Sequence, residues 1–182
     1  MTRRVELVPY NPDWPRIFTV MRRRILERCD GLVVDVEHIG STSVPGLAAK
    51  DVVDLMPGLR AFDDGAKCVP AMESLGFVYK GEFGIPGRHY FNMDDPETGK
   101  RLHNCHMYAI GHDEWIAHLA FRDYLRGYAD WRDRYEALKR HLAVRHRDDV
   151  EAYAEAKTDF VKQVVALSLA ESGSDHSYRR IR

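Results

Sequence analysis

A loop rich in glycine and hydroxyl side chains follows an apolar stretch and contains Gly40, Ser41 and Thr42. Such a loop exposes successive backbone N–H groups, glycine allows close approach of a ligand, and the hydroxyls add donors. The helical turn expected at 47–49 would add the favourable end of its dipole for an anion. Lys50 lies just downstream. The segment therefore predicts a phosphate site, and a plain turn is the alternative.

Asp54 stands in the apolar run 52–56, which is typical of a short buried strand. A carboxylate in such a strand needs a compensating partner, because the burial of an unpaired charge is costly. A metal ion or a lysine would compensate it. Alternatively, Asp54 caps the turn that follows the strand.

A second polar cluster lies in the run 101–108, which alternates as a strand does. Alternation places Asn104 and His106 on one face and His103 on the other. Histidine can bind a metal, transfer a proton or donate to a phosphate. Because His103 and His106 point to opposite faces, a histidine metal site would need a further ligand such as His38 or His89.

Arg88 follows a turn rich in glycine and proline and begins the next expected strand. A guanidinium group can bind two phosphate oxygens at once, so Arg88 is a candidate phosphate ligand. A surface ion pair is the alternative. Turn chemistry at 94–99 predicts that this strand and the strand at 102–109 form a hairpin.

The elements that must position these residues follow from hydrophobic periodicity and from helix-start and helix-stop signals. Strands are expected at 5–8, 33–39, 52–56, 77–80, 88–93 and 102–109, with Pro57 and Gly58 closing the third. Helices are expected at 14–29, 63–75, 112–126, 131–146 and 149–169. This order predicts an α/β (α+β) fold, with a mixed sheet in the N-terminal two thirds and a helical C-terminal third packed on it.

The composition is that of one globular domain. The chain has 182 residues, 45% hydrophobic and 30% charged, with a net charge of -1. We expect a single domain at 1–171 and a disordered polar tail at 172–182. The net charge gives no global basic field, so a nucleic-acid partner is not expected.

Location and redox state also follow from the sequence. The N-terminus shows no apolar signal segment, and no run approaches the roughly 18 apolar residues of a membrane span. Three scattered cysteines form no CxxC pair, so reduced thiols are expected. We therefore expect a cytoplasmic protein that has no membrane partner.

Several blocks together resemble the GrpB family in the same order. They are EHIGSTSVPGLAAK, VVDL, GIPGRHYF, RLHNCHMY and EWIAHLAFRDYLR, within a likeness that extends over 7–165. The resemblance implies a nucleotidyltransferase-like fold and a nucleotide or another phosphorylated small molecule as ligand. A similar domain is fused to dephospho-coenzyme A kinase in some bacteria, which implies a link to coenzyme A biosynthesis.

The superfamily pattern is a Gly-Ser loop followed by a strand with an acid-x-acid pair that holds Mg²⁺ on the triphosphate. Gly40 and Ser41 fit the loop, and Asp54 fits the first acid. Met56 stands at the second acid position and cannot bind Mg²⁺. Asn104 and His106 stand where a third carboxylate is expected, so the acid triad is depleted and the enzyme assignment is left open.

The resemblance and the residues together define one expected site. Its members are Gly40, Ser41, Thr42, Lys50, Asp54, Arg88, His103, Asn104 and His106. In a nucleotidyl or phosphoryl transferase, Asp54 would hold Mg²⁺, and His106 would act as acid or base. The alternatives are a non-catalytic module that binds a nucleotide or a partner protein, and a histidine metal site with hydrolase activity.

Overall fold

The computed structural model describes residues 4–172 and is centred on a five-stranded sheet. The strand order is β1-β2-β5-β4-β3, in which β2 and β5 are parallel and the other neighbours antiparallel. The strands are β1 Val33–Ile39, β2 Val53–Leu59, β3 Val78–Tyr79, β4 His89–Asp94 and β5 Arg101–Ala109. The predicted α/β class with a mixed sheet is confirmed.

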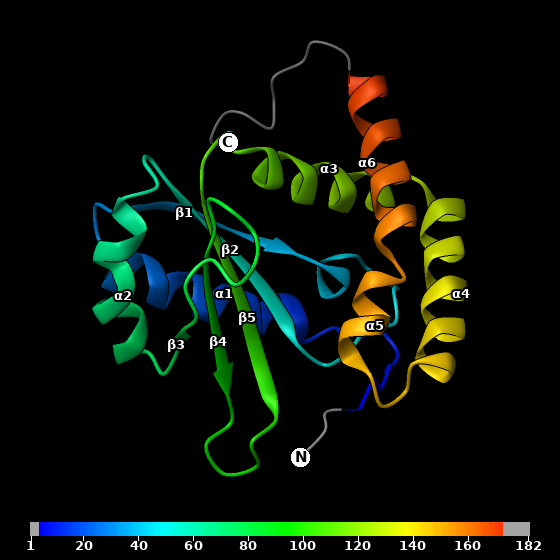
Figure 1. Cartoon of the computed structure of the whole chain (residues 1–182), viewed down its shortest axis with the longest axis horizontal. Helices are drawn as coiled ribbons and strands as arrows, with labels where there is room; N and C mark the ends of the chain where they lie inside the picture. The colour runs from blue at the N-terminus through cyan, green and yellow to red at the C-terminus, as the bar shows by residue number, and fades with distance from the viewer. Residues whose placement is uncertain (1–3, 173–182) are drawn as a thin grey trace.

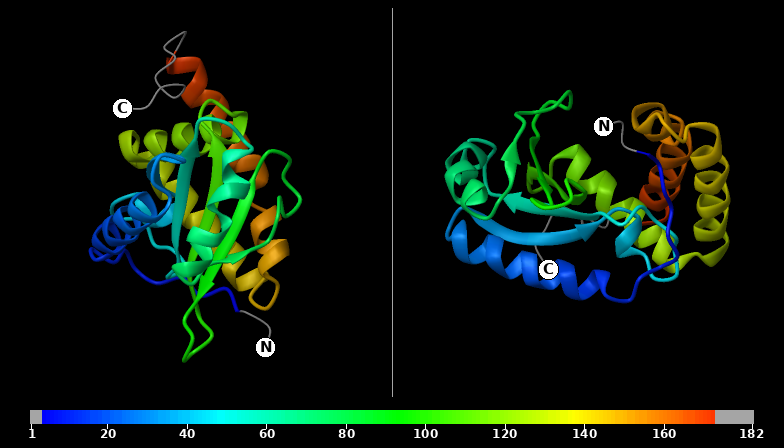
Figure 2. Two further views of the ribbon diagram at one scale, coloured as in Figure 1. Left: turned by 90° about the vertical axis from the view of Figure 1, so that its left-hand side faces the viewer. Right: turned by 90° about the horizontal axis from the view of Figure 1, so that it is seen from below.

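Helices cover both faces of the sheet and stand beside one end of it (Figures 1 and 2). They are α1 Trp14–Arg28, η1 Ser41–Ser43, α2 Asp64–Ser74, α3 Asp113–Gly127, α4 Ala129–Arg145, α5 Val150–Glu155 and α6 Thr158–Ser172. Helices α1 and α2 cover one face, and α3 packs on the other. Helix α3 also contacts α4 and α6. Within residues 4–172, no helix has both the length and the apolar character needed to cross a membrane.

Strand pairing brings the polar residues of distant segments to one place. Ile39 pairs with Asp54, so the loop after β1 lies beside the start of β2. The parallel pairing of β2 and β5 sets Asp54 opposite Asn104. The antiparallel pairing of β4 and β5 sets Tyr90 opposite His106. The prediction that β1, β2 and β5 share one sheet, with the glycine loop at one end, is confirmed.

Strict alternation along β2 and β5 separates the two faces of the sheet. Leu55 and Cys105 are fully buried in the main core beneath α1 and α2. Met56 and Tyr108 are fully buried on the opposite face, beneath α3. All three cysteines are free and buried. Asp54, Asn104 and His106 share the face of Met56, because they lie at even positions of the same strands.

The prediction that Pro57 and Gly58 close β2 is wrong, because the strand continues to Leu59 and Pro57 pairs with Val36. Gly58 is required there by packing rather than by a turn. A Cβ on Gly58 would lie 2.8 Å from side-chain atoms of both Ile110 and Trp115. The missing side chain lets α3 and the segment before it lie directly on the strand.

Several smaller expectations are also corrected. The expected strand at 5–8 is only an isolated bridge between Val8 and Ala49. The same bridge stands in place of the expected helical turn at 47–49. The strand at 77–80 shrinks to β3, and the short helical turn near the glycine loop is η1. The tail expected from 172 begins in α6, and residues 173–182 lie outside the described part of the chain.

The single helix expected at 149–169 is interrupted. Residues 156–157 form a turn between α5 and α6, and no glycine or proline marks it. Lys157 turns inward, with its ammonium group 4.3 Å from the centre of the Tyr153 ring. The turn thereby places a lysine from the C-terminal third beside the sheet.

The apolar side of α4, the helix expected at 131–146, faces the core. Tyr135 and Leu142 are buried, while Trp131 and Leu138 are half-buried against the same clusters. We expect Leu142→Ala to lower the free energy of unfolding by about 2–5 kcal/mol, because it removes a buried side chain packed on Tyr153. Val144→Ala, on the same helix and 83% exposed, should change it little. Denaturant unfolding checks both variants, and equal losses would contradict this packing.

Candidate functional site

The centre of the candidate site is Asp54 on β2. Its Oδ1 accepts a hydrogen bond of 2.8 Å from Nδ2 of Asn104, and its side chain is 24% exposed. Burial raises the pKa of Asp54, and the hydrogen bond from Asn104 and the charge of Lys50 oppose that rise. The requirement for a compensating partner is thus met by an amide donor and by nearby lysines.

The glycine loop lies directly against this carboxylate. Gly40 has a φ of 69°, a left-handed conformation that favours glycine. A Cβ at Gly40 would lie 2.3 Å from Oδ2 of Asp54, so no larger residue fits without displacement of the carboxylate. Ser41 faces Tyr135, and a hydrogen bond between these side chains partly offsets the burial that raises the pKa of Tyr135.

Strands β4 and β5 form the next wall. Arg88 is 6% exposed and lies near His106, with 3.3 Å between its Nη1 and Nδ1 of that histidine. Tyr90 donates a hydrogen bond of 2.9 Å to Oδ1 of Asn104. Nε2 of His106 lies 4.0 Å from Oδ1 of Asp54. Burial, followed by the charge of His118, lowers the pKa of His106 well below its usual value.

Two lysines complete the cleft from the loop after η1 and from the α5–α6 turn. Lys50 and Lys157 lie over the same Tyr153 ring, and both contribute a positive field at Asp54. Burial and the charge of Lys50 lower the pKa of Lys157 to about 8, and Asp54 opposes this. Both ammonium groups therefore lie in the field of one carboxylate.

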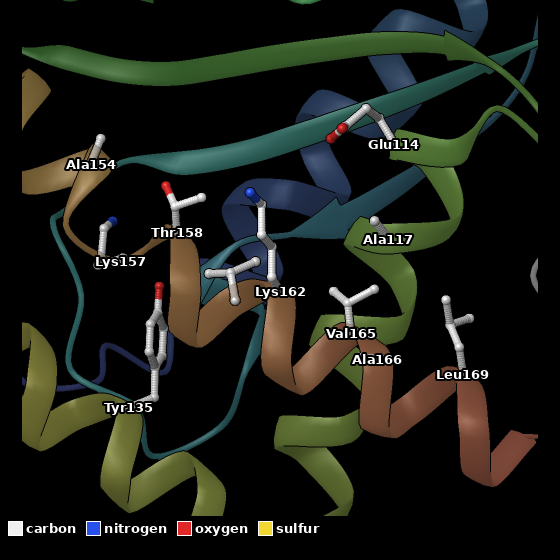
Figure 3. A pocket seen from close by; sticks show the side chains of 11 residues that line it. Glu114, Ala117, Tyr135, Ala154, Lys157, Thr158, Lys162, Val165, Ala166 and Leu169 are labelled. Carbon is white, nitrogen blue, oxygen red and sulfur yellow. The ribbon is translucent and has the colours of Figure 1, made fainter.

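A pocket of about 500 Å³ opens from this cleft between α3 and α6. Figure 3 shows Tyr135, Lys157 and Thr158 together at one end, and Ala117, Val165 and Leu169 toward the other. Glu114 of α3 and Lys162 of α6 add one acidic and one basic group to its wall. The pocket therefore has a polar end at Lys157, whose charge acts on Asp54, and an apolar end between the helices.

Two of the predicted site residues lie elsewhere. His103 is buried on the α1 and α2 face, where its Nδ1 is 3.3 Å from the carbonyl oxygen of Val53. The Thr42 hydroxyl is 3.0 Å from Nε2 of His38, and the His38 ring stacks on Phe18 of α1. The structure brings the remaining predicted residues together: Gly40, Ser41, Lys50, Asp54, Arg88, Asn104 and His106.

The histidines do not assemble a metal cluster. His89 lies beside the Tyr79 hydroxyl and the carbonyl oxygen of Phe62, on the opposite face of the sheet from His106. His118 lies beside His106, with 5.5 Å between the ring centres. Among residues 4–172, no group of three or more His, Cys, Asp or Glu side chains could hold a metal ion.

Sequence reasoning missed five residues of the site: Tyr90, Arg101, His118, Tyr135 and Lys157. Tyr90 and Arg101 could have been inferred from strand alternation and the expected hairpin, because both lie beside predicted members. His118 and Tyr135 come from helices and Lys157 from the turn between α5 and α6, and only the packing of these elements reveals them.

The fold places the chain in a known structural class. It is similar to the Cid1 poly(U) polymerase, with a TM-score of 0.52 and 13% identity over 74% of this chain and 42% of that chain. This likeness shows the predicted nucleotidyltransferase-like fold.

Closer relatives define the family. The model of the GrpB protein family matches residues 4–166. The chain is 35% identical to the UPF0157 protein YqkA of Bacillus subtilis, over 88% of this chain and 46% of YqkA, so it spans less than half of that relative. It is also similar to the crystal structure of the conserved protein GrpB from Enterococcus faecalis, with a TM-score of 0.83 and 34% identity over 91% of this chain and 98% of that chain. The chain belongs to the GrpB family, as its motifs predict.

Proposed function

We propose that the cleft around Asp54 binds a phosphorylated small molecule of nucleotide size. The observation that carries this proposal is that Lys157 lines the polar end of a pocket whose other end is apolar, while its charge, like that of Lys50, acts on Asp54 beside the Gly40 loop. Ammonium and hydroxyl groups suit phosphate oxygens. The pocket volume of about 500 Å³ is within the usual range for small-molecule sites.

The shape of the pocket favours a nucleotide over a bare phosphate. A nucleotide joins a charged phosphate group to a flat base, and the base can stack on apolar walls while its edge forms hydrogen bonds. Ala117, Val165 and Leu169 supply such walls. Glu114 and Lys162 offer an acceptor and a donor in the same pocket. We place the phosphates near Lys157 and the base between α3 and α6.

The depleted acid set favours binding over two-metal nucleotidyl transfer. Met56, at the second acid position, is fully buried beneath α3 and contacts no open space. Asn104, at the position of the third acid, has both ends of its amide engaged by neighbouring side chains. Neither residue can hold a metal as a carboxylate does. The function proposed here is therefore ligand binding.

A thermal-shift screen tests this proposal. ADP, ATP, UMP and dephospho-coenzyme A, the last because of the family link to coenzyme A biosynthesis, are compared with adenosine and uridine as matched controls. A ligand that binds the native state raises the unfolding free energy by about 2.7 kcal/mol at 100 times its Kd. We expect stabilisation by one or more phosphorylated compounds and little by the nucleosides. Equal stabilisation by nucleosides, or none by any compound, would contradict the proposal.

A further inference from the structure

The side-chain amide of Asn104 has only one orientation that satisfies its neighbours. Its Oδ1 lies 2.9 Å from the Tyr90 hydroxyl and 2.8 Å from Nη1 of Arg101. A guanidinium group has donors and no acceptor, so the atom that faces Arg101 must be the amide oxygen. The NH₂ group therefore faces Asp54, where Nδ2 donates to Oδ1 at 2.8 Å.

The ring of His106 is fixed by the same logic. Nη1 of Arg88 lies 3.3 Å from Nδ1 of His106, and Arg88 can only donate, so Nδ1 is the acceptor. Arg88 is itself held in place, because it donates to the carbonyl oxygens of Glu82 and Phe83 at 3.1 Å and 2.7 Å. A neutral imidazole with an accepting Nδ1 carries its proton on Nε2. This protonated Nε2 lies 4.0 Å from Oδ1 of Asp54, beyond hydrogen-bond distance.

These two orientations do not fit a metal ion at Asp54. Metal ligands must offer lone pairs, whereas Asn104 and His106 both present N–H groups toward Oδ1. Oδ2 lies against the backbone of Gly40. Met56 occupies the second acid position. A cation beside Asp54 would therefore meet two donors and one carboxylate, whereas Mg²⁺ requires an octahedral set of oxygens.

We infer that this cleft binds the anionic group of its ligand directly through protein donors, without a divalent cation. The inference rests on the proposed function and specifies how the phosphate is held. Lys157 and Lys50 supply the positive charge that a metal ion supplies elsewhere in the superfamily. Asp54 then serves as a counter-ion for these lysines and as an anchor for Asn104, and its own charge opposes an incoming phosphate.

Calorimetric titration with ADP, in EDTA and in excess MgCl₂, tests the inference on the full chain at pH 6.5. Wild type is expected to bind ADP in EDTA. Asp54→Asn keeps the shape and the hydrogen bond from Asn104 but removes a negative charge, so ADP affinity in EDTA should rise about 3- to 10-fold. Asp30→Asn, an exposed residue beyond the end of α1, is the matched control and should leave the affinity unchanged.

A second measurement is independent of any ligand. Nitrogen chemical shifts of the apo protein should show His106 with a protonated Nε2 and a bare Nδ1, and Arg88→Met should abolish this preference. The inference is overturned by a protonated Nδ1 in wild type, by ADP binding that requires Mg²⁺, or by an affinity that falls in Asp54→Asn. Absence of binding by ADP, ATP, UMP and dephospho-coenzyme A under both conditions would overturn the proposed function as well, so the two failures are distinguishable.

Discussion

Replacing Lys157 by methionine is expected to weaken the binding of a phosphorylated ligand about 10- to 100-fold. A hydrogen bond to a charged group contributes about 1.5–3 kcal/mol, and each 1.4 kcal/mol is a factor of ten in affinity. Methionine keeps the aliphatic part of the side chain and loses only the ammonium group over the Tyr153 ring, so the fold should survive. Calorimetry with ADP measures the change, and Lys67→Met, on the exposed surface of α2, is the matched control.

The Lys157→Met variant should also lose part of the pH dependence of its affinity for an anionic ligand. The pKa of Lys157 is lowered to about 8, so its positive charge is present below that pH and is lost as the pH rises through it. Affinity for an anionic ligand should therefore fall between about pH 7 and pH 9 in wild type. Lys50, Asp54 and Lys139 also interact electrostatically with this lysine, and the charge of Lys157 helps to lower the pKa of Lys139 to about 7, so a Lys139 step should move to higher pH in Lys157→Met. A wild-type affinity that stays constant between pH 7 and pH 9 would contradict the role of Lys157.

Arg122→Met is expected to cause the largest loss of stability, about 3–5 kcal/mol in the free energy of unfolding. Arg122 on α3 is 7% exposed and donates to Glu37 of β1 at 2.5 Å and to the carbonyl oxygen of His38 at 3.1 Å. Its removal leaves Glu37 unpaired in a half-buried position. Denaturant unfolding measures the loss.

Two further variants test whether the stability lost in Arg122→Met comes from the unpaired charge of Glu37. The double variant Arg122→Met/Glu37→Gln should recover part of the stability, because it removes the unpaired charge. Arg23→Met, which breaks an exposed pair with Glu27 on α1, should change stability little. If Arg122→Met were as mild as Arg23→Met, the ion pair would not hold α3 against β1.

Local patterns predicted the half of the site that lies on the sheet. The glycine-serine loop, the acid at Asp54 and the strand alternation at Asn104 and His106 each depend on a few consecutive residues. Period-two alternation is a strong constraint once one face is buried, and it also placed His103 on the opposite face correctly. The inclusion of His103 in the site conflicted with that alternation.

The positions of three residues depend on side-chain packing that local sequence patterns do not encode. Lys157 lies in the site because α5 and α6 separate at a turn without a glycine or proline, where its ammonium group lies over the Tyr153 ring and in the field of Asp54. The Thr42 side chain lies outside the site because its hydroxyl is hydrogen-bonded to Nε2 of His38. Gly58 resembles a turn residue and is instead a packing position beneath Trp115. The deciding partner of Gly58 lies far away in the sequence, whereas His38 and Tyr153 lie only four residues from Thr42 and Lys157.

The most direct test of the proposed binding cleft is a nuclear magnetic resonance titration of the isotope-labelled protein with ADP. The backbone amides of Ser41, Lys157 and Val165 report the loop, the lysine turn and the pocket between α3 and α6. We predict saturable shifts at all three, with amides on α1 and α2 unchanged. Shifts confined to the α1 and α2 face, or no saturable shift at the three reporters, would contradict a phosphate-binding cleft at Asp54.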